Sequence, residues 1–171
     1  MRFIKLGLIS IFVFFLVLTG LTLLFPSDQR ISRAINIAAP RERVLAMVGD
    51  LRQWERWNKF TSASGLTHVQ FSSPSSGPGA FLRADQLRVG IAAASPDSMR
   101  LNWDQSGGKS FRGGFQFLQL RPDSLTVQWW FDFHFRWYPW EKMSSLVFDK
   151  DLGPVMEESL NSLKQLMENS P

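Results

Sequence analysis

The chain has 171 residues, of which 44% are apolar, including fifteen Phe and seven Trp, so it can bury a substantial core. It has no cysteine, which excludes disulfides and thiolate chemistry, and its two histidines stand at separate positions that offer no zinc-type cluster. The net charge is +4, and Arg2 and Lys5 supply two of these charges, so the remainder is too weakly basic for a nucleic-acid footprint. We therefore expect no metal, no cofactor and no nucleic-acid partner.

The N-terminal segment predicts a membrane anchor. Residues 6–25 are twenty residues without a charge, which as a helix would cover about 30 Å, the thickness of a hydrocarbon core. A cleavable signal peptide would have a shorter apolar run followed by a small-x-small site, whereas this run ends in Leu-Leu-Phe-Pro. We favour an uncleaved anchor and linker over residues 1–27, followed by one domain over residues 28–171.

The orientation of this anchor is predicted from its flanking charges. Arg2 and Lys5 precede the apolar run, and a basic N-terminal tail favours retention in the cytoplasm. Arg30 and Arg33 follow the run and weaken this asymmetry. We expect a single-pass membrane protein whose C-terminal domain lies outside the cytoplasm, in a periplasm if the cell has one.

The first part of the domain predicts one strand and two short helices. Residues 30–38 alternate isoleucines with small or polar residues, although Arg33 breaks the apolar face. Pro40 is typical of a helix start, and Asp50 is a suitable cap for a second short helix over residues 50–57. Trp54 and Trp57 are three residues apart, on one side of that helix.

The middle of the chain predicts antiparallel strands joined by turns. The expected strands are residues 66–71, 99–104 and 111–120, with one or two more strands over residues 80–94, bent near Gly90, and a flexible loop over residues 72–79. Residues 107–110 read Gly-Gly-Lys-Ser and superficially resemble the end of a phosphate-binding loop. They lie between two strands and lack the first glycine of that motif, so we interpret them as a hairpin turn.

The longest predicted strand covers residues 125–137. Its large apolar residues alternate with mostly polar ones, which predicts one buried face. A strand of this length must twist and curl, and its concave face must be filled. The apolar spacing of three and four residues from Leu152 to Met167 predicts a helix that fills it, and Gly153-Pro154 should bend or restart that helix. The predicted class is α+β: about six or seven antiparallel strands wrapped around a long C-terminal helix.

This order of elements, and several local sequences, resemble the START-like superfamily, also called SRPBCC or helix-grip proteins. The similar segments are residues 33–40, Val44 with Asp50 and the Trp54-x-x-Trp57 pair, and Gly153 with residues 158–164. They resemble members described as polyketide cyclase/dehydrase-like, including membrane-anchored bacterial ones, over about residues 30–168. The resemblance implies a helix-grip fold with an internal cavity for an apolar or amphipathic ligand.

Aromatic side chains are the candidate lining of this cavity, because a site for an apolar ligand needs apolar walls and few polar groups. The alternative is a solid core closed by the C-terminal helix, since protein interiors pack densely. The candidate residues are Trp54, Trp57, Trp103, Phe117, Trp129, Phe131, Phe133 and Phe135.

Polar residues give little indication of catalysis. His134 stands between Asp132 and Arg136 on the face that we expect to be wet, which disfavours a general base. A basic cluster on the early helices could meet anionic lipids, but we favour a solvated helix face; its members are Arg41, Arg43, Arg52, Arg56 and Lys59.

Three functions remain open. The first is a membrane-tethered module that binds a hydrophobic small molecule or lipid. The second is a cyclase- or aromatase-like enzyme, which would need polar groups inside the cavity. The third, suggested by the same resemblance, is a ligand-free protein-interaction domain similar to the Hsp90-cochaperone branch. The aromatic residues at the inward positions favour the binding module, with no catalytic residue.

Overall fold

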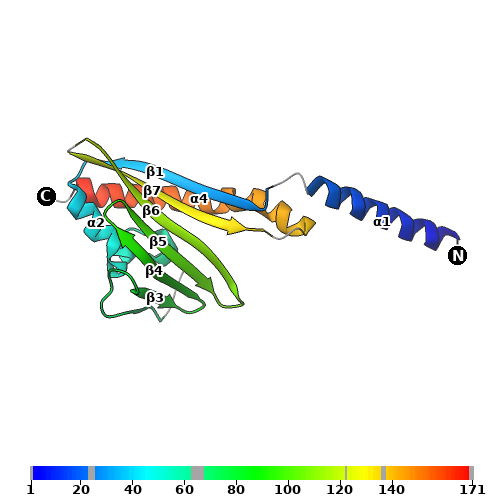
Figure 1. Cartoon of the computed structure of the whole chain (residues 1–171), viewed down its shortest axis with the longest axis horizontal. Helices are drawn as coiled ribbons and strands as arrows, with labels where there is room; N and C mark the ends of the chain where they lie inside the picture. Colours follow the sequence, from blue (N-terminus) through cyan, green and yellow to red (C-terminus); the bar gives the residue numbers. More distant parts are fainter. Residues whose placement is uncertain (1, 23–25, 63–67, 122, 136–137, 170–171) are drawn as a thin grey trace.

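The structure is a computed structural model that describes residues 2–22, 26–62, 68–121, 123–135 and 138–169 (Figure 1). An N-terminal helix, α1 (Arg2–Thr22), precedes the domain. The domain begins with strand β1 (Asp28–Ile37) and three short helices, α2 (Arg41–Gly49), the 3₁₀-helix η1 (Leu51–Arg56) and α3 (Lys59–Ser62). Six strands and a long helix follow: β2 (Gln70–Phe71), β3 (Phe81–Ala84), β4 (Leu87–Ser95), β5 (Ser98–Gln105), β6 (Lys109–Arg121), β7 (Ser124–His134) and α4 (Pro139–Glu168).

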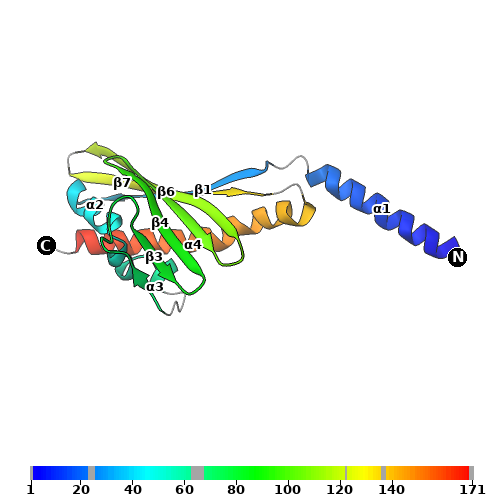
Figure 2. The same cartoon turned by 60° about the horizontal axis from the view of Figure 1, so that its bottom comes forward.

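The strands form one antiparallel sheet with the order β1-β7-β6-β5-β4-β3-β2. The sheet twists, so that β1 and β7 run along α4 while β3, β4 and β5 cross it obliquely (Figures 1 and 2). Helices α2, α3 and α4 lie on one face of the sheet (Figure 2). The predicted α+β helix-grip architecture is confirmed, with seven strands and one covering helix.

Strand β7 is paired along both edges, with β1 on one side and β6 on the other. Its alternation is that predicted, because every second side chain is buried on the face that carries the helices. These residues are Leu125, Val127, Trp129, Phe131, Phe133 and, just past the strand, Phe135. Strand β7 ends at His134, and Trp137 lies outside the described residues.

Helix α4 begins earlier than predicted and is not interrupted. It has 30 residues with Pro154 inside it, so of the two predicted effects of Gly153-Pro154 the restart is wrong, and the bend stays a prediction. Pro154 and Lys150, whose carbonyl loses its partner, are both exposed, so water can satisfy that carbonyl. Packing on both sides of the proline offsets the remaining cost, because a row of apolar side chains holds the second half on the sheet: Met156, Leu160, Leu163 and Met167.

Arg33, which interrupts the apolar face of β1, forms two ion pairs with α4. Its Nε donates to Glu157 at 2.6 Å and its Nη2 to Asp149 at 3.0 Å. The hydrogen bond to Glu157 raises the pKa of Arg33 above its ordinary value. A Cβ atom at position 153 would collide with this guanidinium, so Gly153 makes room for it. The glycine therefore lets a charged strand residue lie against the helix.

The smaller strands differ in extent from those predicted. The strand predicted over residues 66–71 is described only as β2, since residues 63–67 lie outside the described part. Residues 80–94, predicted as one or two strands, form two, β3 and β4, which are joined by a turn at Asp85. The pairing of β4 with β5 is irregular between Ile91 and Ala93, next to the bend predicted near Gly90. Asp85 has a φ of 44°, and Asp tolerates this left-handed conformation better than most residues. The four-residue helix α3 was not predicted.

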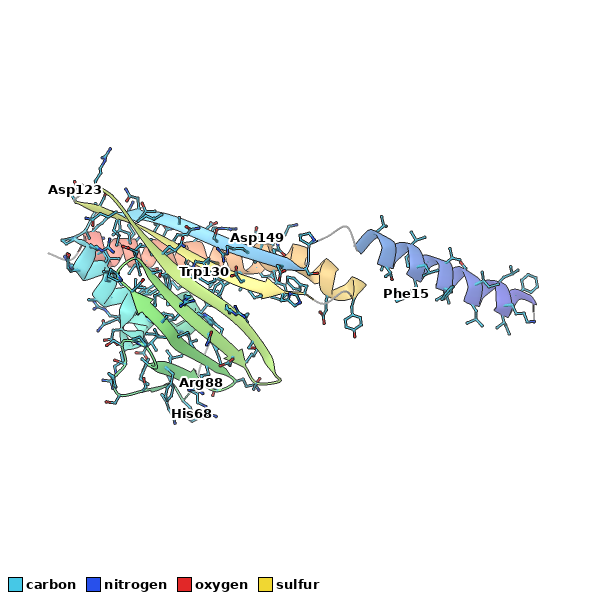
Figure 3. The ribbon with its side chains drawn as sticks, viewed as in Figure 1. Phe15, His68, Arg88, Asp123, Trp130 and Asp149 are labelled. Carbon is cyan, nitrogen blue, oxygen red and sulfur yellow. The ribbon has the colours of Figure 1, made fainter. Side chains whose placement is uncertain are left out.

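Helix α1 has the properties of a membrane span. Residues Phe3–Leu21 have a mean hydropathy of 2.4, and none of this stretch is buried within the protein. Phe15 projects from α1 into open space, like the other side chains of this helix (Figure 3). By length and composition the helix fits either a single membrane span or a signal sequence.

On the sheet face away from the helices, Trp130 covers a glycine of the neighbouring strand. Trp130 and Gly114 are direct partners between β7 and β6. A Cβ atom at Gly114 would stand 2.9 Å from Cζ2 of Trp130 and would collide with the backbone oxygen of Met99. The Arg30 guanidinium lies over the same indole, 4.6 Å from its ring centroid. This packing explains why Trp130 departs from the polar alternation of β7.

We predict that Gly114→Ala destabilises the domain by about 2 kcal/mol, because neither a backbone carbonyl nor a packed indole can move away cheaply. Gly49→Ala is the matched control, since a Cβ there meets nothing within 4 Å and alanine favours the helix. Chemical denaturation of the full chain in detergent measures both. Equal midpoints for the two variants would contradict the close packing at Gly114.

Candidate functional site

The inner face of the sheet carries a continuous cluster of aromatic rings. Ring centroids are 5.4 Å apart for Phe60 and Trp129, 5.2 Å for Trp103 and Phe131, and 5.1 Å for Phe111 and Phe133. All eight residues predicted to line a cavity are buried in this cluster. Trp54 and Trp57 come from η1 and its C-cap and pack against the sheet, and the others are on or next to its inner face: Trp103, Phe117, Trp129, Phe131, Phe133 and Phe135. The cluster is therefore one site formed by η1, β5, β6 and β7.

Four aromatic members were missed by the sequence analysis: Phe60, Phe111, Phe115 and Phe148. Phe111 and Phe115 share the inward alternation of β6 and could have been found from it. Phe60 lies on α3, and Phe148 lies in the part of α4 that no periodicity indicated. Phe148 packs 5.2 Å from Phe133 and 5.6 Å from Phe135 and extends the cluster toward the start of α4.

Helix η1 holds its two tryptophans through a network around Asp50. The Asp50 carboxylate accepts hydrogen bonds from the Arg52 amide at 3.0 Å and from the Ser75 hydroxyl at 2.7 Å. The Trp54 indole N–H donates to the Val48 carbonyl at 2.8 Å. The predicted cap at Asp50 is confirmed, and it orients Trp54 and Trp57 toward the sheet.

Three other buried tryptophans have no hydrogen-bond acceptor within the described part of the chain. The indole N–H groups of Trp57, Trp103 and Trp129 are fully enclosed and lack a partner there. A buried donor left without an acceptor costs about 1–3 kcal/mol. Three such donors within one aromatic cluster are therefore an expensive feature for a core that serves packing alone.

A cleft of about 780 Å³ opens where β6 and β7 separate. Pairing between these strands begins at Arg112 and Asp132, whereas β7 continues along β1 to His134 and β6 continues along β5 to Lys109. The two strands diverge in Figures 1 and 2. Phe111 and Phe133 line the cleft on either side of the gap, so it reaches the edge of the aromatic cluster.

The remaining lining of the cleft is polar and carries both signs of charge. Arg30 and Asp132 form a two-pronged ion pair, from Nε to Oδ1 at 2.6 Å and from Nη2 to Oδ2 at 2.8 Å. The hydrogen bond to Asp132 raises the pKa of Arg30 above its ordinary value. The other polar lining residues are Asp28, Gln29, Asn102, Asp104, Ser110, Arg112 and His134.

His134 is exposed, and its partner differs from the one that its sequence neighbours suggest. Its Nδ1 lies 2.7 Å from the Asp28 carboxylate on β1, while Asp132 is occupied by Arg30. Cross-strand pairing, not the i,i+2 spacing, places a carboxylate beside this histidine.

The basic residues of the early helices do not form one solvated face. Arg41 donates to Asp97 and to the Pro96 carbonyl, and Lys59 lies 3.7 Å from Glu158. These two cations thus bind different elements, the β4–β5 turn and α4.

The family of the chain is decided by a sequence profile described as "Polyketide cyclase / dehydrase and lipid transport", which matches residues 28–168. The chain belongs to this family. The resemblance inferred from the sequence is confirmed, and it covers everything after the linker except the last three residues. A search of curated proteins finds no significant match.

Solved structures share the fold of this polyketide cyclase/lipid transport family member. CalU16 from Micromonospora echinospora is 14% identical over 84% of this chain and 77% of its own, with a TM-score of 0.60. A START superfamily protein from Mycobacterium smegmatis is 16% identical over 82% and 97%, with a TM-score of 0.56. Norcoclaurine synthase from Thalictrum flavum, in complex with dopamine and hydroxybenzaldehyde, is 10% identical over 88% and 92%, with a TM-score of 0.61. At these identities the likeness shows a START-like ligand-binding fold and not a shared ligand.

We predict that Trp54→Phe destabilises the ligand-free chain by about 1 kcal/mol more than Trp129→Phe. Both residues are fully buried, so the loss of ring volume is matched, but only Trp54 also loses a hydrogen bond. Chemical denaturation of the two variants measures the difference. Equal losses would mean that the Trp129 N–H has an acceptor, such as a bound water.

Proposed function

We propose that this protein is a membrane-tethered module that binds a hydrophobic small molecule or lipid against the aromatic face of its sheet. The family includes lipid transport proteins, and the fold is a ligand-binding one. In this chain the inward positions of β7 are Trp129, Phe131 and Phe133, whose rings are buried in the aromatic cluster. A ligand bound among these rings is stabilised by about 25 cal/mol for each Å² of its apolar area that leaves water.

The observation that carries the proposal is the set of three buried indole N–H groups without an acceptor within the described residues. Indole N–H groups donate only, so they require an oxygen or nitrogen lone pair from a water or a ligand. A hydrophobic ligand with a carbonyl, carboxyl or ether oxygen would supply it. We therefore expect the ligand to be mostly apolar with an acceptor oxygen that lies within the aromatic cluster.

The alternative function is an enzyme whose reacting groups would lie in the cleft and not among the aromatic rings. The cleft at the edge of the aromatic cluster holds ionisable groups, including His134 and Asp28, and both are largely exposed. General acid–base catalysis needs such groups within hydrogen-bond reach of a held substrate. His134→Ala separates the two functions, because a binding module keeps its affinity and an enzyme loses turnover.

Binding is tested by tryptophan fluorescence during titration with two probes of similar size, a fatty acid and the corresponding hydrocarbon. Trp129→Phe keeps an apolar ring but removes one donor, so we expect affinity for the fatty acid to fall about tenfold and affinity for the hydrocarbon to stay unchanged. Trp130→Phe on the opposite face is the control. If neither probe changes the emission of the unaltered chain, the binding function is wrong.

The tether is proposed to be α1, on the basis of its uncharged, unburied span from Phe3 to Leu21. Leu16→Asp should abolish membrane insertion, because an aspartate near the centre of a span costs about 3 kcal/mol. Carbonate extraction and the mass of the mature chain measure this, with Leu16→Ala as the control. A soluble product that begins near Ser27 would show that the segment is a cleaved signal.

A further inference from the structure

The cleft between β6 and β7 lies at the membrane-proximal end of the domain. Asp28 lines the cleft. It comes seven residues after Leu21, where the apolar span ends. Seven extended residues reach at most about 25 Å, so this end of β1 must stay close to the bilayer surface if α1 is the tether. The β5–β6 turn points to the side from which α1 leaves, and α1 contacts α4, whose start lies beside the end of α1 (Figures 1 and 2). Asp123, by contrast, lies at the far end (Figure 3).

Two opposite charges in the cleft have no ion-pair partner among the described residues. Arg30, Asp132, Asp28 and His134 are engaged with one another in two pairs. Arg112 and Asp104 also line the cleft, and neither forms an ion pair within the described part of the chain. By register Asp132 lies opposite Arg112 on β7, and Arg88 lies opposite Asp104 on β4. Asp104 is the direct partner of Ser110, so Arg112 is its diagonal neighbour on the same face, where Cα atoms are about 7–8 Å apart. A cation and an anion that belong to neither ion pair thus stand on the same face of the cleft.

The cleft reaches the edge of the aromatic cluster at two phenylalanine rings. Phe111 and Phe133 line the cleft with their ring centroids 5.1 Å apart. Phe111 also stacks on Trp103, at 5.9 Å with an interplanar angle of 11°. Phe148 adds a further ring on α4 beside Phe133, and 36% of this side chain is exposed. A long apolar chain entering here would therefore meet phenylalanine rings along its length.

We propose that this cleft is a head-group site and lateral entrance for a zwitterionic phospholipid with a primary ammonium, of the phosphatidylethanolamine type. Arg112 binds the phosphate, because a guanidinium makes paired hydrogen bonds to phosphate oxygens. Asp104 accepts hydrogen bonds from the ammonium. An acyl chain passes between β6 and β7 over Phe111 and Phe133. This inference rests on the proposed tether and binding function, and it adds the ligand class and the route of entry.

The test uses the full chain in detergent, incubated with an equimolar mixture of phosphatidylethanolamine, phosphatidylcholine and phosphatidylglycerol with identical acyl chains. Native mass spectrometry then measures which lipids are retained. We expect about tenfold more phosphatidylethanolamine than phosphatidylcholine, whose methylated ammonium cannot donate to Asp104. Equal retention of the three lipids by the unaltered chain would overturn the head-group site.

Two variants assign the roles. Arg112→Gln should lower retention of all three phospholipids about tenfold, because all three carry the phosphate. Asp104→Asn should remove the preference for phosphatidylethanolamine over phosphatidylcholine while total retention persists. The controls are Arg83→Gln and Asp123→Asn, which change exposed charges of the same kinds outside the cleft. Equal effects of the cleft variants and their controls would overturn the assignment. All four positions are on the surface, so melting temperatures should stay close to that of the unaltered chain.

Two further measurements distinguish a failure of the head-group site from a failure of the proposed binding function. Water-soluble phosphoethanolamine should compete only weakly, since it lacks the chain that contacts the phenylalanines; competition equal to that of the lipid would show a site for the free head group and overturn the entrance. An uncharged hydrophobic fluorescent probe reports the aromatic cluster alone. If the probe binds while no lipid is preferred, the head-group site is wrong and the binding function stands. If neither the probe nor any lipid binds, both are wrong.

Discussion

The structure depends on covering the apolar face of β7. Six large side chains, from Leu125 to Phe135, lie on one face of a single strand, and each would expose apolar surface if that face stayed open. A sheet alone cannot cover its own face, so the long helix α4 and the short helices between β1 and β2 are needed. The twist of the sheet brings β1 and β7 along α4, and this leaves β6 free to diverge at one end.

Small residues and charges adjust this arrangement locally. Gly153 lets the Arg33 guanidinium lie against α4 between two carboxylates, so a cation on the inward side of β1 is kept in a paired, partly wet position. Gly114 lets Trp130 lie flat on the opposite face beneath Arg30. In both cases a glycine, which has no Cβ atom, makes room for a side chain that does not fit the polar–apolar alternation of its strand. The exceptions in the sequence pattern are thus packed features and not flaws in the sheet.

The divergence of β6 and β7, which follows from the twist of the sheet, also connects the interior of the domain to its surface. Where β6 and β7 stop pairing, Phe111 and Phe133 line a cleft whose rim is charged. The apolar cluster and the polar rim are therefore adjacent, which is the arrangement that an amphipathic ligand requires. Three indole donors without described acceptors lie in the interior, and two unpaired charges lie at the rim. Under the proposed function, a ligand with an acceptor oxygen would satisfy the interior donors.

The sequence alone determined the fold class, the buried face of β7, the cap at Asp50 and the inward position of every candidate aromatic residue, because side-chain alternation and capping are local properties of the backbone. It could not locate Phe60 or Phe148, since short or weakly periodic helices are fixed by what they pack against. It also could not find the cleft, because the end of pairing between β6 and β7 depends on how the whole sheet twists. Tertiary structure decided, for the same reason, that His134 meets Asp28, that Asp132 meets Arg30, and that Arg112 and Asp104 remain unpaired among the described residues. Residues more than a hundred positions apart become neighbours only when the strands that carry them are paired.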